Sequence, residues 1–141
     1  MICADSSFIV SKYIADIHSA EADRRMRQDV RVSLTPLNRA EVAHAIHQYA
    51  FRKVMSSEEA QIVWNEFDRD CANGLWSQVG LPETIWETSI DLARRHGPRL
   101  GVRTLDSLHV ACALALKAER FWTFDERQAR LADAVGLATG D

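Results

Sequence analysis

A chain of 141 residues, 47% hydrophobic and 26% charged, has the composition of an ordinary globular protein, and its length predicts a single domain over residues 1–141. The longest unbroken apolar run, residues 110–116, is far shorter than the roughly 18 residues of a bilayer span. No basic stretch precedes an apolar one at the N-terminus, so we expect neither a signal peptide nor a membrane partner. Three scattered cysteines without a Cys-x-x-Cys pair predict neither a zinc site nor disulfides, which favours a cytoplasmic location.

Charge is unevenly distributed along the chain, although its net value is only −3. Residues 1–53 carry +2, residues 54–91 carry −7, and residues 92–141 carry +2. Arginine outnumbers lysine 14 to 3, and the planar guanidinium suits phosphate groups. Genomic base composition and an acidic solvated face explain this pattern at least as well. The charges therefore permit a nucleic-acid partner without indicating one.

Hydrophobic periodicity and helix-capping signals predict strands that alternate with helices. In chain order we expect a strand over 2–4, a helix from 8 to 14, a strand over 30–34, and helices from 38 to 53 and from 56 to 73. A strand over 75–79, helices from 82 to 96 and from 104 to 116, a strand over 121–124 and a helix from 126 to 134 follow. Gly97-Pro98 is expected to end one helix, and the helix 104–116 is apolar enough to be buried. This order favours an α/β fold whose central, mostly parallel sheet is flanked by helices on both faces.

Four acidic residues lie where such a fold gathers ligand-binding groups. Asp5 directly follows the first predicted strand and Asp125 the last, and parallel sheets bind ligands beyond the carboxyl ends of their strands. Asp106 lies in the first turn of the apolar helix, and Glu41 lies near the start of the helix 38–53. Each acid alone is explained by helix capping, by the helix dipole or by an exposed helix face. Together they are hard oxygen donors of the kind that suits Mg²⁺ or Mn²⁺.

Three stretches of the chain resemble the PIN-domain ribonucleases and, within that family, the VapC-type toxins of bacterial toxin–antitoxin pairs. The stretches are Ile2-Cys3-Ala4-Asp5-Ser6-Ser7, Leu34-Thr35-Pro36-Leu37-Asn38-Arg39-Ala40-Glu41-Val42, and Arg103-Thr104-Leu105-Asp106-Ser107-Leu108-His109-Val110-Ala111 with Thr123-Phe124-Asp125 and Leu131-Ala132. The third is the most specific, because Asp106 and Asp125 lie nineteen residues apart across a helix and a strand. The resemblance covers nearly the whole chain and implies a single PIN-like domain.

The resemblance implies a metal-dependent endoribonuclease toxin. The implied catalytic and metal-binding residues are Asp5, Glu41, Asp106 and Asp125. One or two Mg²⁺ or Mn²⁺ ions held there would activate water for attack on an RNA phosphodiester, leaving a 5′-phosphate and a 3′-hydroxyl. Ser6 and Thr123 match hydroxyl positions of the family and would orient carboxylates or water. The implied partners are RNA, a cognate VapB-type antitoxin and a second copy of the chain. The short polar C-terminus, residues 136–141, departs from relatives that add a final strand.

Histidines and tryptophans outside this set have simpler explanations than chemistry. His44 and His47 lie three residues apart on one helix, but nothing around them completes a zinc site, so we expect a surface or partly buried pair. His109 follows Asp106 by three residues on the same side of the helix, so a hydrogen bond to Asp106 stays open, but we expect it to pack against the sheet. The acidic block of residues 54–91 contains Trp64, Trp76 and Trp86. We expect at least two of these tryptophans in the core, and part of the block against an antitoxin or a second subunit.

Two other functions remain open for the same acidic cluster. A non-catalytic PIN-fold binding module would use it to hold a structural ion or the arginines of a partner. A phosphatase would use it to hydrolyse a small substrate. Metal-dependent turnover of a phosphodiester separates the first alternative from a nuclease, and dependence on RNA length separates the second.

Overall fold

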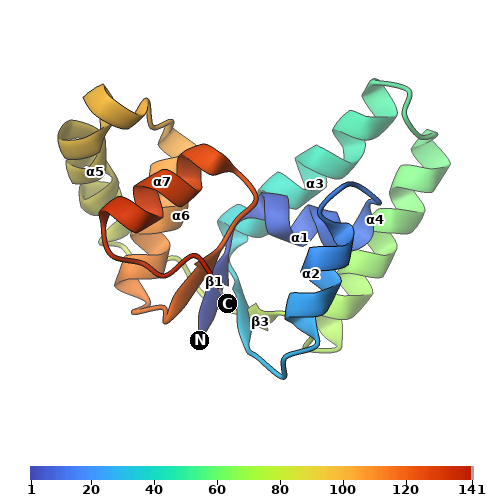
Figure 1. Ribbon diagram of the computed structural model, residues 1–141. Coiled ribbons are helices and arrows are strands. Elements are labelled where there is room, and N and C mark those ends of the chain that lie inside the picture. The colour runs from blue at the N-terminus through green and yellow to red at the C-terminus, as the bar shows by residue number, and fades with distance from the viewer. Residues whose placement is uncertain (141) are drawn as a thin grey trace.

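The computed structural model describes residues 1–140, over which four short strands alternate with seven helices (Figure 1). The strands are β1 (Ile2–Ala4), β2 (Val32–Leu34), β3 (Ser77–Gln78) and β4 (Arg120–Trp122). The helices are α1 (Ser6–Tyr13), α2 (Ser19–Met26), α3 (Pro36–Phe51), α4 (Ser57–Ala72), α5 (Ile85–Leu100), α6 (Thr104–Ala115) and α7 (Glu126–Ala134). Every predicted strand and helix is present, with ends that differ by a few residues from those expected.

The strands form one parallel sheet in the order β3-β2-β1-β4. β1 lies between β2 and β4, so Ile2 is in register with both Val32 and Arg120. Helices α1–α4 lie on one side of the sheet and α5–α7 on the other (Figure 1). The predicted α/β fold with a parallel sheet between helical layers is therefore confirmed. Because the strands share one direction, the residues that follow β1 and β4 meet at the same edge.

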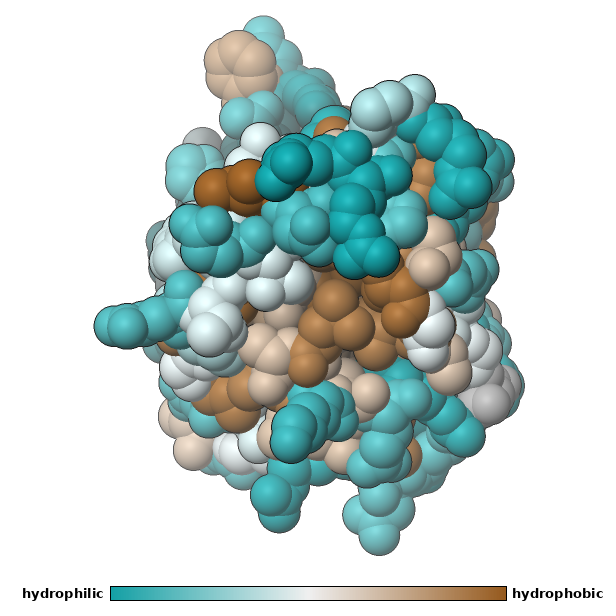
Figure 2. Space-filling model, turned by 90° about the vertical axis from the view of Figure 1, so that its left-hand side faces the viewer, coloured by the Kyte–Doolittle hydropathy of each residue, from teal (hydrophilic) through white to brown (hydrophobic). Residues whose placement is uncertain are grey.

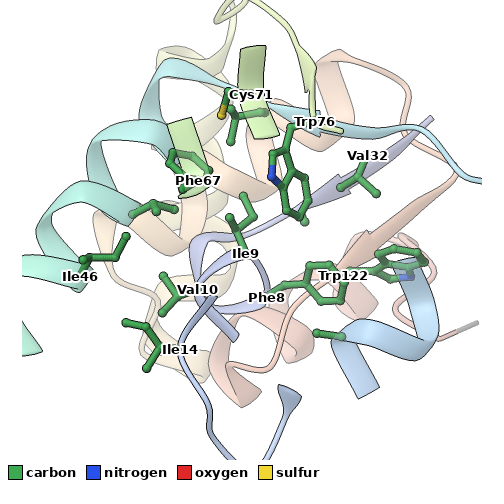
Figure 3. Packing of buried hydrophobic residues seen from close by; sticks show 14 of the residues in the cluster. Phe8, Ile9, Val10, Ile14, Val32, Ile46, Phe67, Cys71, Trp76 and Trp122 are labelled. Atoms are coloured by element: carbon green, nitrogen blue, oxygen red, sulfur yellow. The ribbon is translucent and has the colours of Figure 1, made fainter. Parts of the chain in front are cut away.

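Alternate side chains of each strand enter two separate cores. The core beneath α1, α3 and α4 receives Ile2, Ala4, Val32, Leu34 and Trp122 from the sheet (Figure 3). The core beneath α5, α6 and α7 receives Cys3 and Phe121. α6 is buried along most of its length, as its apolar sequence predicts. The two cores fix the sheet from both faces and so hold its carboxyl edge in place.

Two helices differ from the sequence prediction for physical reasons. The prediction that Gly97-Pro98 ends a helix is wrong, because α5 continues to Leu100 and ends at Gly101, whose φ of 64° suits glycine. Pro98 is tolerated because it lies in the last turn, where the lost N–H costs a single hydrogen bond of a helix already packed against α6. α2 escapes prediction because Ala22 is the single buried residue among its eight, so no apolar stripe marks it.

The remaining sequence expectations concern single residues and the C-terminal edge. Trp76 is fully buried and Trp64 packs against the same core, whereas Trp86 is 56% exposed, so two of the three tryptophans are core residues. His44 and His47 are exposed, as expected. Within residues 1–140, the C-terminal segment adds a single bridge between Ala138 and Arg120 to the β4 edge instead of a full strand. None of the helices in this range has the length and apolar character needed to cross a membrane.

Candidate active site

All four acids of the predicted site line one pocket of about 440 Å³, which we call the carboxylate pocket. Asp5 directly follows β1 and caps α1, and Asp125 caps α7 three residues after β4. Asp106 lies in the first turn of α6, and Glu41 lies in the second turn of α3. Strand ends and helix N-termini thus bring together side chains that lie up to 120 residues apart in the chain.

Asp5 is a buried carboxylate, 2% exposed, whose hydrogen-bond donors within residues 1–140 are neutral. The Ser7 hydroxyl donates to its two oxygens, at 2.7 and 2.8 Å, and the Phe8 backbone N–H donates at 3.0 Å. Burial raises the pKa of Asp5 above its ordinary value, and these hydrogen bonds offset part of that effect. A negative charge in such a position is stabilised by a cation that enters the pocket.

Arg103 connects two of the other acids. Its Nε and Nη2 donate to Asp106 at 2.9 and 3.1 Å, and Nη2 also donates to Asp125 at 3.2 Å. Burial acts to raise the pKa of Asp106, but the hydrogen bonds from Arg103 outweigh it and hold that pKa below its usual value. Asp106 is 1% exposed, whereas the Arg103 side chain is 59% exposed. The guanidinium therefore lies between two carboxylates, on their solvent side, where a metal cation would also be attracted.

Glu41 is held by two residues from different elements. The Ser6 hydroxyl donates to Oε1 of Glu41 at 3.0 Å, and Nε2 of His109 hydrogen-bonds with the same oxygen. His109 is 3% exposed and lies three residues after Asp106 on α6. Its imidazole thus reaches from α6 to α3. The expectation that His109 packs against the sheet did not include this contact with Glu41. The spacing from Asp106 is the one sequence signal that puts His109 on the face of α6 turned toward the pocket.

The two predicted supporting hydroxyls both lie next to the acids. Ser6 contacts Glu41, as described, and Oγ1 of Thr123 accepts a hydrogen bond from the Asp125 backbone N–H at 3.0 Å. Thr123 also hydrogen-bonds to Asp5, and this bond lowers the pKa of that carboxyl. Sequence reasoning gave no role to Ser7, Arg103 or Gln128, which also line the pocket. Ser7 and Arg103 belong to the stretches that carry the family resemblance, and this was the only feature of the sequence that linked them to the site.

The donor chemistry of the carboxylate pocket fits Mg²⁺ or Mn²⁺. One carboxylate is buried among neutral donors, and two others are bridged by a guanidinium, which is itself a cation. In residues 1–140, no three His, Cys, Asp or Glu side chains are grouped closely enough to hold a metal ion as they stand. Within that range, Arg103 is paired with Asp106 and Asp125, and His109 is paired with Glu41. Movement of the exposed Arg103 toward solvent would free Asp106 and Asp125 for a metal ion.

Comparison with known proteins gives a family and several similar structures. A family model described as the PIN domain matches residues 2–134. No curated protein sequence matches the chain. Solved structures that share the fold over nearly the full length of both chains include the following three.

The first is VapC20 of Mycobacterium tuberculosis, described as a sarcin-ricin loop cleaving toxin, with a TM-score of 0.72, 15% identity and coverage of 99% of this chain and 98% of that one. FitAcB from Neisseria gonorrhoeae has a TM-score of 0.75 at 14% identity and covers 100% and 97%. VapBC2 from Rickettsia felis, bound to a DNA fragment from the promoter, has a TM-score of 0.67 at 14% identity and covers 99% and 98%. At 14–15% identity, the similarity to these structures establishes the fold and nothing beyond it.

Proposed function

Because the chain belongs to the PIN-domain family, whose model matches residues 2–134, we propose that it is a metal-dependent endoribonuclease of the VapC toxin type. The observation that carries this proposal is the convergence of Asp5, Glu41, Asp106 and Asp125 on one pocket at the carboxyl edge of the sheet. The structural likeness to VapC20, a toxin that cleaves the sarcin-ricin loop, supports RNA as the substrate. The four acids are the residues that would hold Mg²⁺ or Mn²⁺.

The divalent ion, when bound, supplies a Lewis acid that makes water a nucleophile and neutralises charge on the phosphate. The residues of the chain prepare the pocket for that ion and for RNA. Ser6 and His109 direct the Glu41 carboxylate, while Ser7 fixes both oxygens of Asp5. Neutralising the four acids raises the net charge of the chain from −3 to +1, so an RNA backbone is no longer repelled from the loaded pocket.

The proposed partners are a VapB-type antitoxin and a second copy of the chain. The fold is shared with FitAcB and with VapBC2, and VapBC2 was solved bound to a DNA fragment from the promoter. These similarities support an antitoxin as a partner. The face that carries α5 has hydrophobic side chains gathered among hydrophilic ones (Figure 2). Exposed large apolar residues on α5 and at the start of α6 are Trp86, Ile90 and Leu105. A partner that covers them would remove apolar surface from water.

Cleavage of RNA by the purified chain, free of antitoxin, tests the proposal. Incubation of total cellular RNA with wild-type protein and Mn²⁺ should give discrete fragments, and EDTA should abolish them. Asp106→Asn removes a charge with little change in volume and should abolish cleavage. Asp91→Asn, an exposed acid of α5 outside the pocket, is the matched control and should cleave like the wild type. Cleavage by Asp106→Asn at the wild-type rate would refute the assignment of the pocket.

The binding module remains the second candidate, because one arginine already occupies the acidic pocket. Arg103 forms ion pairs with Asp106 and Asp125 from within the chain. An arginine of a partner protein could make the same contacts if it displaced Arg103. This function predicts that metal-loaded protein turns over neither RNA nor a small phosphodiester, yet binds an arginine-containing peptide in a way that depends on Asp106.

A further inference from the structure

A second pocket, of about 450 Å³, opens directly beside the carboxylate pocket. The two pockets share four lining residues, which are Ser6, Ser7, Glu41 and Asp125. Beyond these, the second pocket lies between the segment joining α1 to α2, the C-terminal half of α3, and Phe124, two residues after β4. A polymer that places a phosphate among the acids therefore has room for an adjoining unit in this second pocket.

One wall of the second pocket is a stack of two flat rings. The His18 imidazole lies parallel to the Phe124 ring, with centroids 4.3 Å apart and planes inclined by 6°. The Phe124 ring also stacks on Phe8, which is fully buried, at 5.5 Å and 27°. Arg25 lies over Phe124 at 5.9 Å from its centroid. The aromatic wall is thus anchored to the core and is not free to rotate away.

The segment that carries His18 is held in place by Asp16. The His18 backbone N–H donates to Oδ1 of Asp16 at 2.7 Å, and the Ser11 hydroxyl donates to Oδ2 at 2.9 Å. The Asp16 carboxylate therefore ties the segment to α1, and His18 is presented in a fixed position before any ligand arrives. A preformed aromatic surface loses little conformational entropy when a ligand stacks on it.

The opposite wall comes from α3 and supplies polar and charged groups. Gln48 and Tyr49 lie in the last turn of this helix, Arg52 is its C-cap residue, and all three line the pocket. Gln48 offers an amide that can both donate to and accept from the edge of a base. Arg52 offers a guanidinium for a phosphate of the backbone. Aromatic surface, an amide and a cation around one hollow are the combination that binds unpaired nucleotides.

We propose that this second pocket binds one unpaired RNA base next to the scissile phosphate, with the base stacked on the His18–Phe124 wall. The proposal rests on the function proposed above and adds to it a position that holds the nucleotide next to the scissile phosphate. A base inside a duplex is stacked and paired on both sides and cannot enter such a pocket. Recognition then comes from the second pocket, and the chemistry comes from the four acids.

RNA binding by variants of His18 and diester turnover by the wild-type chain test this assignment. The probe for binding is a short fluorescein-labelled RNA of mixed sequence, followed by fluorescence anisotropy in an Asp106→Asn background that does not cleave. His18→Ala should raise the Kd for this RNA about tenfold, equal to ~1.4 kcal/mol. His18→Phe keeps a flat ring and should retain most of the affinity. His44→Ala, an exposed histidine of α3 outside both pockets, is the matched control. The same RNA annealed to its complement should bind more weakly than the single strand.

Hydrolysis of bis(p-nitrophenyl) phosphate separates this proposal from the proposed function. The wild-type chain should hydrolyse this diester in Mn²⁺ and lose the activity in EDTA, whether or not the second pocket binds a base. Equal RNA affinity of the His18→Ala and His44→Ala proteins would overturn the base pocket even if RNA is cleaved. Equal affinity for single-stranded and duplex RNA, or no RNA binding at all, would overturn it as well. Loss of affinity in His18→Ala without any diester turnover by the wild-type chain would keep the binding pocket and refute the nuclease.

Discussion

Replacement of Arg103 by glutamine tests whether its guanidinium holds the place of a cation between two acids. The change removes the charge-assisted hydrogen bonds to Asp106 and Asp125 and leaves a shorter, uncharged polar side chain. Hydrogen bonds to charged groups contribute ~1.5–3 kcal/mol each, but Arg103 is 59% exposed and its ion pairs are screened by water. We expect the metal-free variant to lose about 1–2 kcal/mol of unfolding free energy, because Asp106 stays buried without its countercharge.

The same variant should bind Mn²⁺ more tightly. In the wild type a metal ion must displace the guanidinium from Asp106 and Asp125, and this competition is absent after the substitution. We expect the Kd for Mn²⁺ to fall about three- to tenfold, equal to ~0.7–1.4 kcal/mol. Saturating Mn²⁺ should therefore recover the stability that the variant lost in EDTA, since ligands of the native state stabilise it.

Thermal unfolding in EDTA and calorimetric titration with Mn²⁺ measure the two effects. The expected loss of stability corresponds to a decrease in Tm of about 3–8 °C. Arg95→Gln is the matched control, because Arg95 pairs with Asp91 on the exposed surface of α5 and contributes little. Weaker Mn²⁺ binding by Arg103→Gln would refute the reasoning, because it would mean that the guanidinium supports the metal site and does not compete for it.

Three further substitutions probe the site and its scaffold. His109→Ala should lower the kcat for RNA about tenfold or more with little change in KM, because Glu41 loses one of its two hydrogen-bond partners. Kinetic measurements, with circular dichroism to check the fold, test this, and an unchanged kcat would contradict it. Phe8→Ala should cost ~3–5 kcal/mol in urea unfolding, because the ring is fully buried against Trp122, and a loss below ~1 kcal/mol would contradict the packing. Gly101→Ala should cost about 1 kcal/mol in the same assay, since its φ of 64° disfavours a side chain, and a stabilised variant would contradict this conformation.

The sequence predicted the sheet and the location of the acids because both depend on local order. Apolar strands that stop at Asp5 and shortly before Asp125 put both carboxylates at one edge as soon as the strands are parallel. Asp106 and Glu41 lie near the starts of helices. In such a fold the N-termini of these helices lie at the carboxyl edge of the sheet. Periodicity and chain direction therefore suffice to gather the four acids in one pocket.

The contacts around the acids lay beyond prediction because they depend on side-chain reach across separate elements. His109 contacts Glu41, which lies 68 residues earlier in the chain. Its spacing of three residues from Asp106 predicts that both side chains share one face of α6, but it does not predict a contact with another helix. Arg103 bridges to Asp125 over 22 residues by means of a long exposed side chain. The second pocket depends on the segment between α1 and α2, for which no element was predicted. Local patterns fix the positions of backbone elements, whereas these interactions depend on how the elements pack.

The most direct test of the nuclease is the chemistry of the RNA ends that it produces. A cleaved site would be mapped first, and an oligonucleotide around it would then be made with a single 2′-deoxy substitution at the nucleotide whose 2′-hydroxyl adjoins the scissile phosphate. We expect wild-type protein with Mn²⁺ to cleave both oligonucleotides and to leave a 5′-phosphate and a 3′-hydroxyl, because the proposed nucleophile in the carboxylate pocket is water. A 2′,3′-cyclic phosphate, together with resistance of the 2′-deoxy oligonucleotide, would contradict it, because the 2′-hydroxyl of the RNA would then be the nucleophile.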